Sequence, residues 1–82
     1  MYLKPLRADL KRYLLRQNTE KKFAKQLALF LQNPRHPSLH TELLKPKEKK
    51  VYSFRIDRKY RAIFIYLGKG EIEIIDINPH YQ

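Results

Sequence analysis

The chain has 82 residues, no cysteine, and 18 Lys and Arg against 8 Asp and Glu, which gives a formal charge of +10. This length suits one small domain, residues 1–82, that buries little more than about 60% of its unfolded surface, and the composition excludes disulfides and thiolate metal sites. The positive charge predicts a polyanionic partner, with nucleic acid first and an acidic protein second. We expect neither a metal nor a cofactor.

The N-terminal half reads as a short strand followed by two amphipathic helices. Residues 2–4 can form the strand. A helical period then runs from Pro5 to residue 17 or 18, and a second one, capped by Asn18 or Thr19, stops at Asn33 before a proline. The apolar positions are Leu6, Leu10, Tyr13 and Leu14 in the first helix, and Phe23, Leu27, Phe30 and Leu31 in the second. Two such helices with a minimal link predict a helical hairpin packed on a flat layer.

The segment from residue 33 to residue 50 is irregular and basic, because prolines interrupt any regular element. Its lysines are Lys45, Lys47, Lys49 and Lys50. They form either a solvated loop or a contact with a polyanion. His36 and His40 flank Pro37, and we interpret both as surface loop residues rather than ligands. Glu42 is a carboxylate close to these lysines, so it is either a general base or an ion-pair partner.

The C-terminal half reads as an antiparallel meander. Alternating or apolar runs cover residues 51–57, 60–67 and 71–77, and glycines at 68 and 70 favour a turn between the last two. Helices first and strands afterwards indicate an α+β fold, with the helical hairpin on one face of a small, mostly antiparallel sheet. The other face of the sheet would stay open.

Two arginines lie in consecutive predicted strands, and the length of the loop between them decides their relation. A three-residue loop at residues 57–59 pairs Arg55 with Arg61 on one face, whereas a two-residue loop sends Arg55 to the other face. Like charges in direct opposition are destabilising, so the first register predicts an anion between them. The alternative places Arg61 beside a carboxylate such as Asp57 or Asp76.

A histidine and a tyrosine, His80 and Tyr81, follow the last predicted strand. An imidazole takes or gives a proton at neutral pH, and a phenol can orient a phosphate or stack on a base. The pattern alone leaves a frayed, solvent-exposed tail as the alternative.

The chain resembles toxins of the RelE/ParE superfamily from type II toxin–antitoxin pairs over nearly its whole length. The resemblance covers the helical hairpin, the NPRHPSL segment, the ELL stretch, the run VYSFRIDRKYRAIFIY and the HY ending. Within the superfamily it is similar to the YoeB-like ribonucleases, which carry a glutamate before the first arginine strand, two arginines in the hairpin and a terminal His-Tyr pair. The matching positions here are Glu42, Arg55, Arg61, His80 and Tyr81.

This resemblance implies a RelE-like fold and metal-independent cleavage of mRNA in the ribosomal A site. The 2′-hydroxyl would attack the adjacent phosphate and leave a 2′,3′-cyclic phosphate. Glu42 would be the general base and His80 the general acid. Arg61, with Arg55, would stabilise the phosphorane, Tyr81 would position the phosphate, and the four lysines would bind RNA. Ser53 stands where RelE itself has a lysine, which disfavours a lysine-based mechanism.

The same resemblance implies an acidic antitoxin, encoded beside this gene, that covers the helices and the basic site. The other partners would be mRNA and 16S-type rRNA. Because no apolar stretch approaches the roughly 20 residues of a membrane span and charged residues interrupt the N-terminus, we expect a cytoplasmic protein without membrane contact. Two further functions of the superfamily stay open, namely a ParE-like inhibitor of DNA gyrase and a catalytically inactive nucleic-acid-binding relative. The acid and base pair, Glu42 and His80, separates a nuclease from a pure binding protein.

Overall fold

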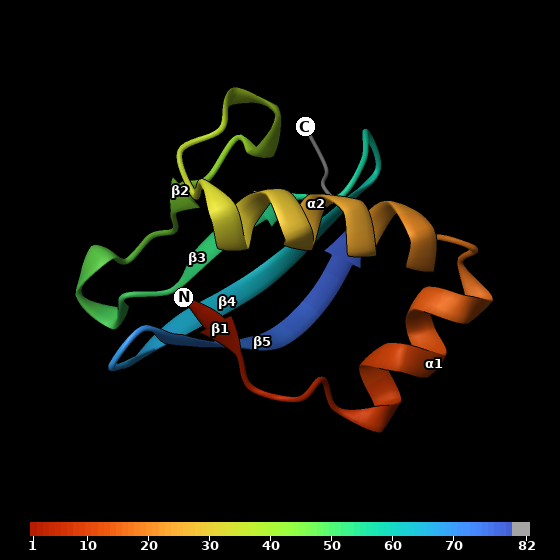
Figure 1. Cartoon of the computed structure of the whole chain (residues 1–82), viewed down its shortest axis with the longest axis horizontal. Helices are drawn as coiled ribbons and strands as arrows, with labels where there is room; N and C mark the ends of the chain where they lie inside the picture. Colours follow the sequence, from red (N-terminus) through yellow and green to blue (C-terminus); the bar gives the residue numbers. More distant parts are fainter. Residues whose placement is uncertain (80–82) are drawn as a thin grey trace.

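The computed structural model describes residues 1–79, which form a helical layer on a sheet of five strands (Figure 1). In chain order the elements are β1 (Tyr2–Leu3), α1 (Ala8–Arg16), α2 (Glu20–Gln32), the 3₁₀ turn η1 (Pro37–Leu39), β2 (Glu42–Leu43), the 3₁₀ turn η2 (Lys47–Lys49), β3 (Tyr52–Arg55), β4 (Tyr60–Gly68) and β5 (Glu71–Pro79). The predicted α+β class, with both helices on one face of the sheet, is confirmed.

The sheet has the order β1-β5-β4-β3-β2. β3, β4 and β5 form the predicted antiparallel meander, and β1 pairs with β5 in parallel. β2 pairs antiparallel with β3 and places Glu42 opposite Ser53. The sequence predicted only an irregular segment there, because a strand of two residues is too short to show alternation. Among the described residues no helix is long and apolar enough to cross a membrane.

The first helix begins at Ala8 instead of the predicted Pro5. The guanidinium of Arg7 donates to both carboxylate oxygens of Asp9, at 3.0 and 3.1 Å, and to the carbonyl of Ile75 at 3.0 Å. These bonds hold the residues before α1 extended beside β5. Thr19 occupies the cap position of α2, but its hydroxyl donates back to the Leu14 carbonyl, so the predicted side-chain cap is wrong.

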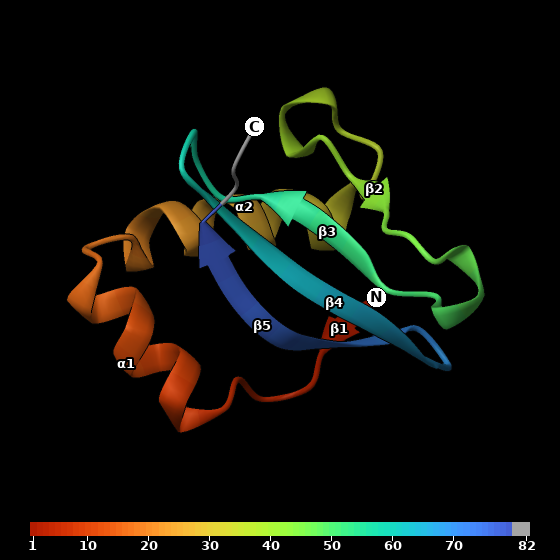
Figure 2. The same cartoon turned by 180° about the vertical axis from the view of Figure 1, so that it is seen from behind.

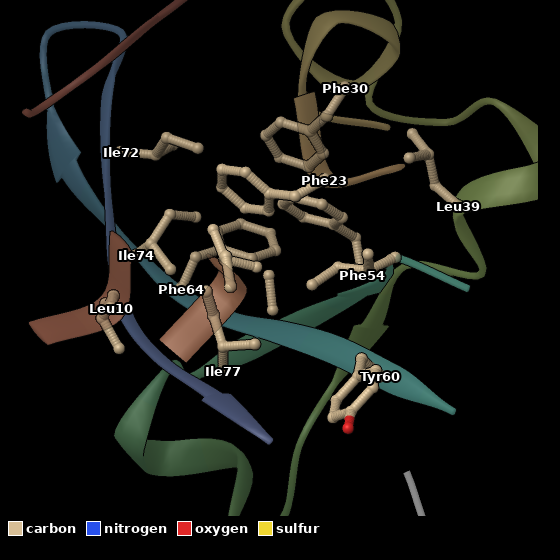
Figure 3. Packing of buried hydrophobic residues seen from close by; sticks show 13 residues of the cluster. Leu10, Phe23, Phe30, Leu39, Phe54, Tyr60, Phe64, Ile72, Ile74 and Ile77 are labelled. Atoms are coloured by element: carbon tan, nitrogen blue, oxygen red, sulfur yellow. The ribbon is translucent and has the colours of Figure 1, made fainter. Parts of the chain in front are cut away.

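The core lies between α2 and the sheet and is rich in phenylalanine (Figure 3). Phe30 of α2 stacks on Phe54 of β3 with a centroid distance of 5.1 Å and meets Phe64 of β4 edge-on at 4.8 Å. Such aromatic pairs stabilise a fold by about 0.5–1.5 kcal/mol beyond the burial of their area. Since Phe54 and Phe64 point to the helices, their strand neighbours point to the opposite face, which no helix of the described chain covers (Figure 2).

A β-bulge changes the alternation of β5. Ile63 pairs with Asp76, but the next residue of β4, Phe64, pairs with Ile74, so that Ile75 is an extra residue. The bulge allows isoleucines on both sides of it to be buried, namely Ile72, Ile74 and Ile77. Beyond the bulge, Asn78 comes opposite Arg61 on the open face.

Candidate functional site

The hairpin between β3 and β4 places Arg55 directly opposite Arg61. The register follows from the three-residue loop at residues 57–59, in which Asp57 Oδ1 accepts hydrogen bonds from the backbone N–H groups of Lys59 and Tyr60, both at 2.8 Å. An Asp side chain that satisfies two loop N–H groups fixes the loop length. Of the two registers that the sequence left open, the structure therefore has the odd one, with both cations on one face of the sheet.

A small pocket with a volume of about 50 Å³ lies around this pair of arginines. Its lining residues come from the β3–β4 hairpin, from β2 and from the loop before β2: His40, Glu42, Ser53, Arg55, Asp57, Tyr60 and Arg61. The structure thus brings together three of the predicted site residues, Glu42, Arg55 and Arg61. His80 and Tyr81 lie outside the described residues.

Neither arginine is neutralised by a carboxylate within residues 1–79. Arg61 Nε donates to Asn78 Oδ1 at 3.2 Å, and Asn78 Nδ2 in turn donates to Asp76 Oδ2 at 3.2 Å. Over the same residues the guanidinium of Arg55 has no hydrogen-bond or ion-pair partner. The alternative in which Arg61 pairs with Asp57 or Asp76 is not observed. Two facing and uncompensated cations repel each other, and an anion between them would remove this repulsion.

Asp57 lines the pocket, but its carboxylate already accepts the hydrogen bonds that hold the β3–β4 turn. Burial raises the pKa of its carboxyl group, but the hydrogen bonds from Tyr60 and Lys59 and the ammonium of Lys22, at 3.5 Å, outweigh burial and leave that pKa below its ordinary value. The group is therefore ionised at neutral pH and already accepts three donors. Glu42 has no hydrogen bond or ion pair within residues 1–79, which makes it the available carboxylate of the pocket.

His40 is the pocket residue that the sequence interpretation missed. η1 turns the chain, and His40 follows it with a left-handed φ of 45° and a backbone N–H bond to the Pro37 carbonyl. This turn brings the imidazole to the same pocket as Glu42. The sequence carries no signal for this placement, because it depends on the left-handed backbone of His40 after η1. His36 is a loop residue as predicted, and its Nδ1 accepts from the Ser38 N–H.

The basic segment is exposed and lies away from the pocket. Lys45, Lys47, Lys49 and Lys50 surround η2, which precedes the first residue of β3, whereas Arg55 is the last residue of β3. None of the four lines the pocket. The four lysines therefore form a separate charged surface at the end of β3 opposite to the arginine pair (Figure 1). Among residues 1–79, no cluster of three or more His, Asp and Glu side chains could hold a metal ion.

Comparisons with known proteins agree with this fold. The structure superposes on a YoeB/ParE toxin from Agrobacterium tumefaciens with a TM-score of 0.73 and 22% identity, covering 99% of this chain and 100% of that one. A YoeB–YefM complex from Staphylococcus aureus gives a TM-score of 0.69 at 22% identity, covering 98% of this chain and 94% of the matched one. At this level of identity these likenesses establish the fold.

Sequence comparison adds the family. An uncharacterized protein of Haemophilus influenzae is 43% identical over 44 residues, which is 54% of this chain and 43% of that protein, so the match spans less than half of the relative. A family model described as the RelE-like toxin of the type II toxin–antitoxin system HigB matches residues 4–80. Because this match covers nearly the whole sequence, the chain belongs to the HigB-like family of RelE-like toxins from type II toxin–antitoxin systems.

Proposed function

We propose that this toxin is a ribosome-dependent endoribonuclease that cleaves mRNA in the A site and so inhibits translation. The observation that carries the proposal is the pocket in which two uncompensated guanidinium groups, Arg55 and Arg61, accompany the unpaired carboxylate of Glu42. A binding protein that recognises phosphate needs only the cations. A carboxylate without a partner beside them supplies the general base that phosphodiester cleavage requires.

The proposed reaction is an internal transfer that needs no metal or other cofactor. Glu42 accepts the proton of the 2′-hydroxyl while the 2′-oxygen attacks phosphorus. Arg55 and Arg61 donate to the non-bridging oxygens, whose charge grows in the phosphorane. The bond to the 5′-oxygen then breaks, His80 protonates that oxygen, and Tyr81 positions the phosphate. The products are a 2′,3′-cyclic phosphate and a free 5′-hydroxyl. We assign His80 and Tyr81 from the resemblance of the chain ending.

The proposed partners follow from charge and family. The four lysines around η2 bind phosphates of 16S-type rRNA at a distance from the cleaved bond, which increases affinity without entering the chemistry. An acidic antitoxin encoded beside the gene neutralises this cytoplasmic toxin. Support for that partner comes from the Staphylococcus aureus neighbour, which was solved as a YoeB–YefM complex.

The test uses ribosomes programmed with mRNA and primer-extension mapping of the product. We expect Glu42→Gln to lower the single-turnover cleavage rate by about 10²–10⁴-fold and Arg61→Gln to lower it by about 10²–10³-fold. Arg58→Gln is the matched control, because Arg58 is an exposed cation in the same hairpin and does not line the pocket. Cleavage by both site variants at the wild-type rate would overturn the mechanism.

A ParE-like function remains the second candidate, and the same variants separate it. An inhibitor of gyrase needs no general base, so Glu42→Gln would still arrest growth and purified toxin would block DNA supercoiling while the mRNA stayed intact. An inactive relative would show neither effect with the wild-type chain.

A further inference from the structure

A second and larger hollow lies beside the pocket, between the loop that follows α2 and the sheet. Its volume is about 650 Å³, within the roughly 300–1,000 Å³ of sites that hold small ligands. It is lined by Asn33, Pro34, Arg35, His36, Pro37, His40, Thr41, Tyr52 and Tyr66. We call it the tyrosine groove. Figure 1 shows the loop from α2 to β2 standing next to the C-terminal end of α2, at the sheet edge formed by β2.

The floor of the groove is an aromatic platform anchored in the core. Tyr52 stacks on Phe64 at 5.6 Å, and Tyr66 meets the Tyr52 ring edge-on at 5.1 Å. Tyr66 nevertheless keeps 46% of its surface exposed. Burial, and then the neighbouring Tyr52, raise the pKa of the Tyr66 phenol, so the ring is uncharged at neutral pH. A fixed and partly open aromatic ring is a surface on which a nucleobase can stack.

The charge of the groove suits RNA, and its composition does not suit an apolar peptide. No carboxylate lines it among the described residues, whereas Arg35 and two histidines do. The guanidinium of Arg35 is exposed and has no hydrogen-bond or ion-pair partner within residues 1–79. Its lining contains no Leu, Ile, Val, Phe or Met. Aromatic rings combined with a free guanidinium are the usual means of holding an unstacked nucleotide.

His40 lines both hollows, but the other residues that carry the two sites lie on different faces of the sheet. Tyr52 and Tyr66 are on the helix-facing side with Phe64, whereas Arg55 and Arg61 are on the open face. We propose that the tyrosine groove binds one nucleotide of single-stranded RNA away from the cleaved phosphate, with its base on Tyr66 and its phosphate on Arg35. This binding does not rest on the proposed nuclease function.

The experiment measures binding of a single-stranded RNA hexamer, made non-cleavable by 2′-O-methyl groups and containing 2-aminopurine, whose fluorescence falls on stacking. Wild type and Tyr66→Phe should quench this probe. Tyr66→Leu, which retains apolar packing but has no ring, should remove the quenching and weaken binding by about 5- to 150-fold, the range for loss of one stacked base. Tyr2→Ala is the matched control, because Tyr2 is exposed at the other edge of the sheet.

Arg35→Gln gives a second test that leaves the core untouched. It should lower the affinity for the hexamer and reduce the slope of log affinity against log salt by about 0.7, the value for one phosphate contact on a single strand. Equal affinity and quenching in wild type and Tyr66→Leu would overturn the proposal. An effect of Tyr66→Leu on antitoxin affinity alone, with RNA binding unchanged, would assign the groove to a protein partner and also overturn it.

Ribosomal cleavage assayed in parallel distinguishes the two proposals. If wild type cleaves mRNA while Tyr66→Leu and Arg35→Gln match it in RNA affinity, the groove proposal fails and the nuclease stands. If RNA binding depends on Tyr66 and Arg35 but no mRNA is cleaved, the nuclease fails and the groove stands.

Discussion

Replacing Arg55 with Gln should make the toxin more stable and less active. Arg55 and Arg61 are opposite each other in the register of β3 and β4, where β-carbons are about 4.5–5.5 Å apart. Two unit charges at about 4 Å repel by about 1 kcal/mol in water, and the guanidinium groups can move apart, so a cross-strand cost of about 0.2–1 kcal/mol is expected. Removing one charge should therefore stabilise the folded state by this amount.

The expected gain appears in the unfolding temperature. For a domain of 60–100 residues, about 1 kcal/mol corresponds to about 4–8 °C, so Arg55→Gln should raise the midpoint by about 1–8 °C at low ionic strength. The assay is thermal unfolding followed by far-UV circular dichroism. Arg58→Gln is again the control, because it removes the same charge from the same hairpin without an opposing cation, and so corrects for the net charge of +10.

Salt and cleavage provide two independent checks on Arg55→Gln. In 1 M NaCl the screening length falls to about 3 Å, so the difference from Arg58→Gln should shrink toward zero. The cleavage rate should fall by about 10²–10³-fold, as for loss of one donor to a phosphorane. The reasoning is refuted if Arg55→Gln is no more stable than Arg58→Gln at low salt, because the two arginines would then not repel.

Three further changes test the supports of the site. Gln26 is buried and donates to the carbonyls of Arg55 at 2.9 Å and Ser38 at 3.3 Å. Gln26→Leu leaves these carbonyls without this donor, so it should lower the free energy of unfolding in urea by about 1–3 kcal/mol. A change below about 0.5 kcal/mol would contradict this. Folding lowers the pKa of Asp57 from its ordinary value of 3.8. Its contribution to the free energy of unfolding is therefore fully present above pH 3.8 and is lost as the pH falls through the lowered pKa. Asp57→Ala should therefore cost about 1–2 kcal/mol at pH 7 and progressively less in acid; a penalty independent of pH would be inconsistent with the carboxylate as its cause. Changing both Lys47 and Lys49 to Gln should raise the toxin concentration needed for half-maximal cleavage and leave the maximal rate intact, whereas a lower maximal rate would place these lysines in the chemistry.

The fold class was predictable because it depends on long periodic segments. The stripe of α2 and the apolar run of β4 each extend over several turns or residues, and the core pair Phe30 and Phe64 comes from those two segments. Short features were not predictable. β2 has two residues, and the start of α1 depends on the contact of Arg7 with the carbonyl of Ile75, which is distant in sequence.

The candidate site was predictable in its residue types and only partly in its geometry. Loops of two and three residues both fitted the sequence between β3 and β4, so the facing of Arg55 and Arg61 depended on how Asp57 satisfies the turn. His40 was misjudged because its place in the pocket depends on η1 turning the chain. Proximity of this kind arises from backbone angles, which a pattern of residue types does not encode.

The bulge at Ile75 means that β5 carries one residue more than its pairing with β4 requires. The strand has one phase of alternation before the bulge and the opposite phase after it. Deleting Ile75 would leave Ile74 and Ile77 two positions apart on the core face, with Asn78 still opposite Arg61. One deleted codon at this position would therefore remove the bulge and leave both the core and the candidate site in place.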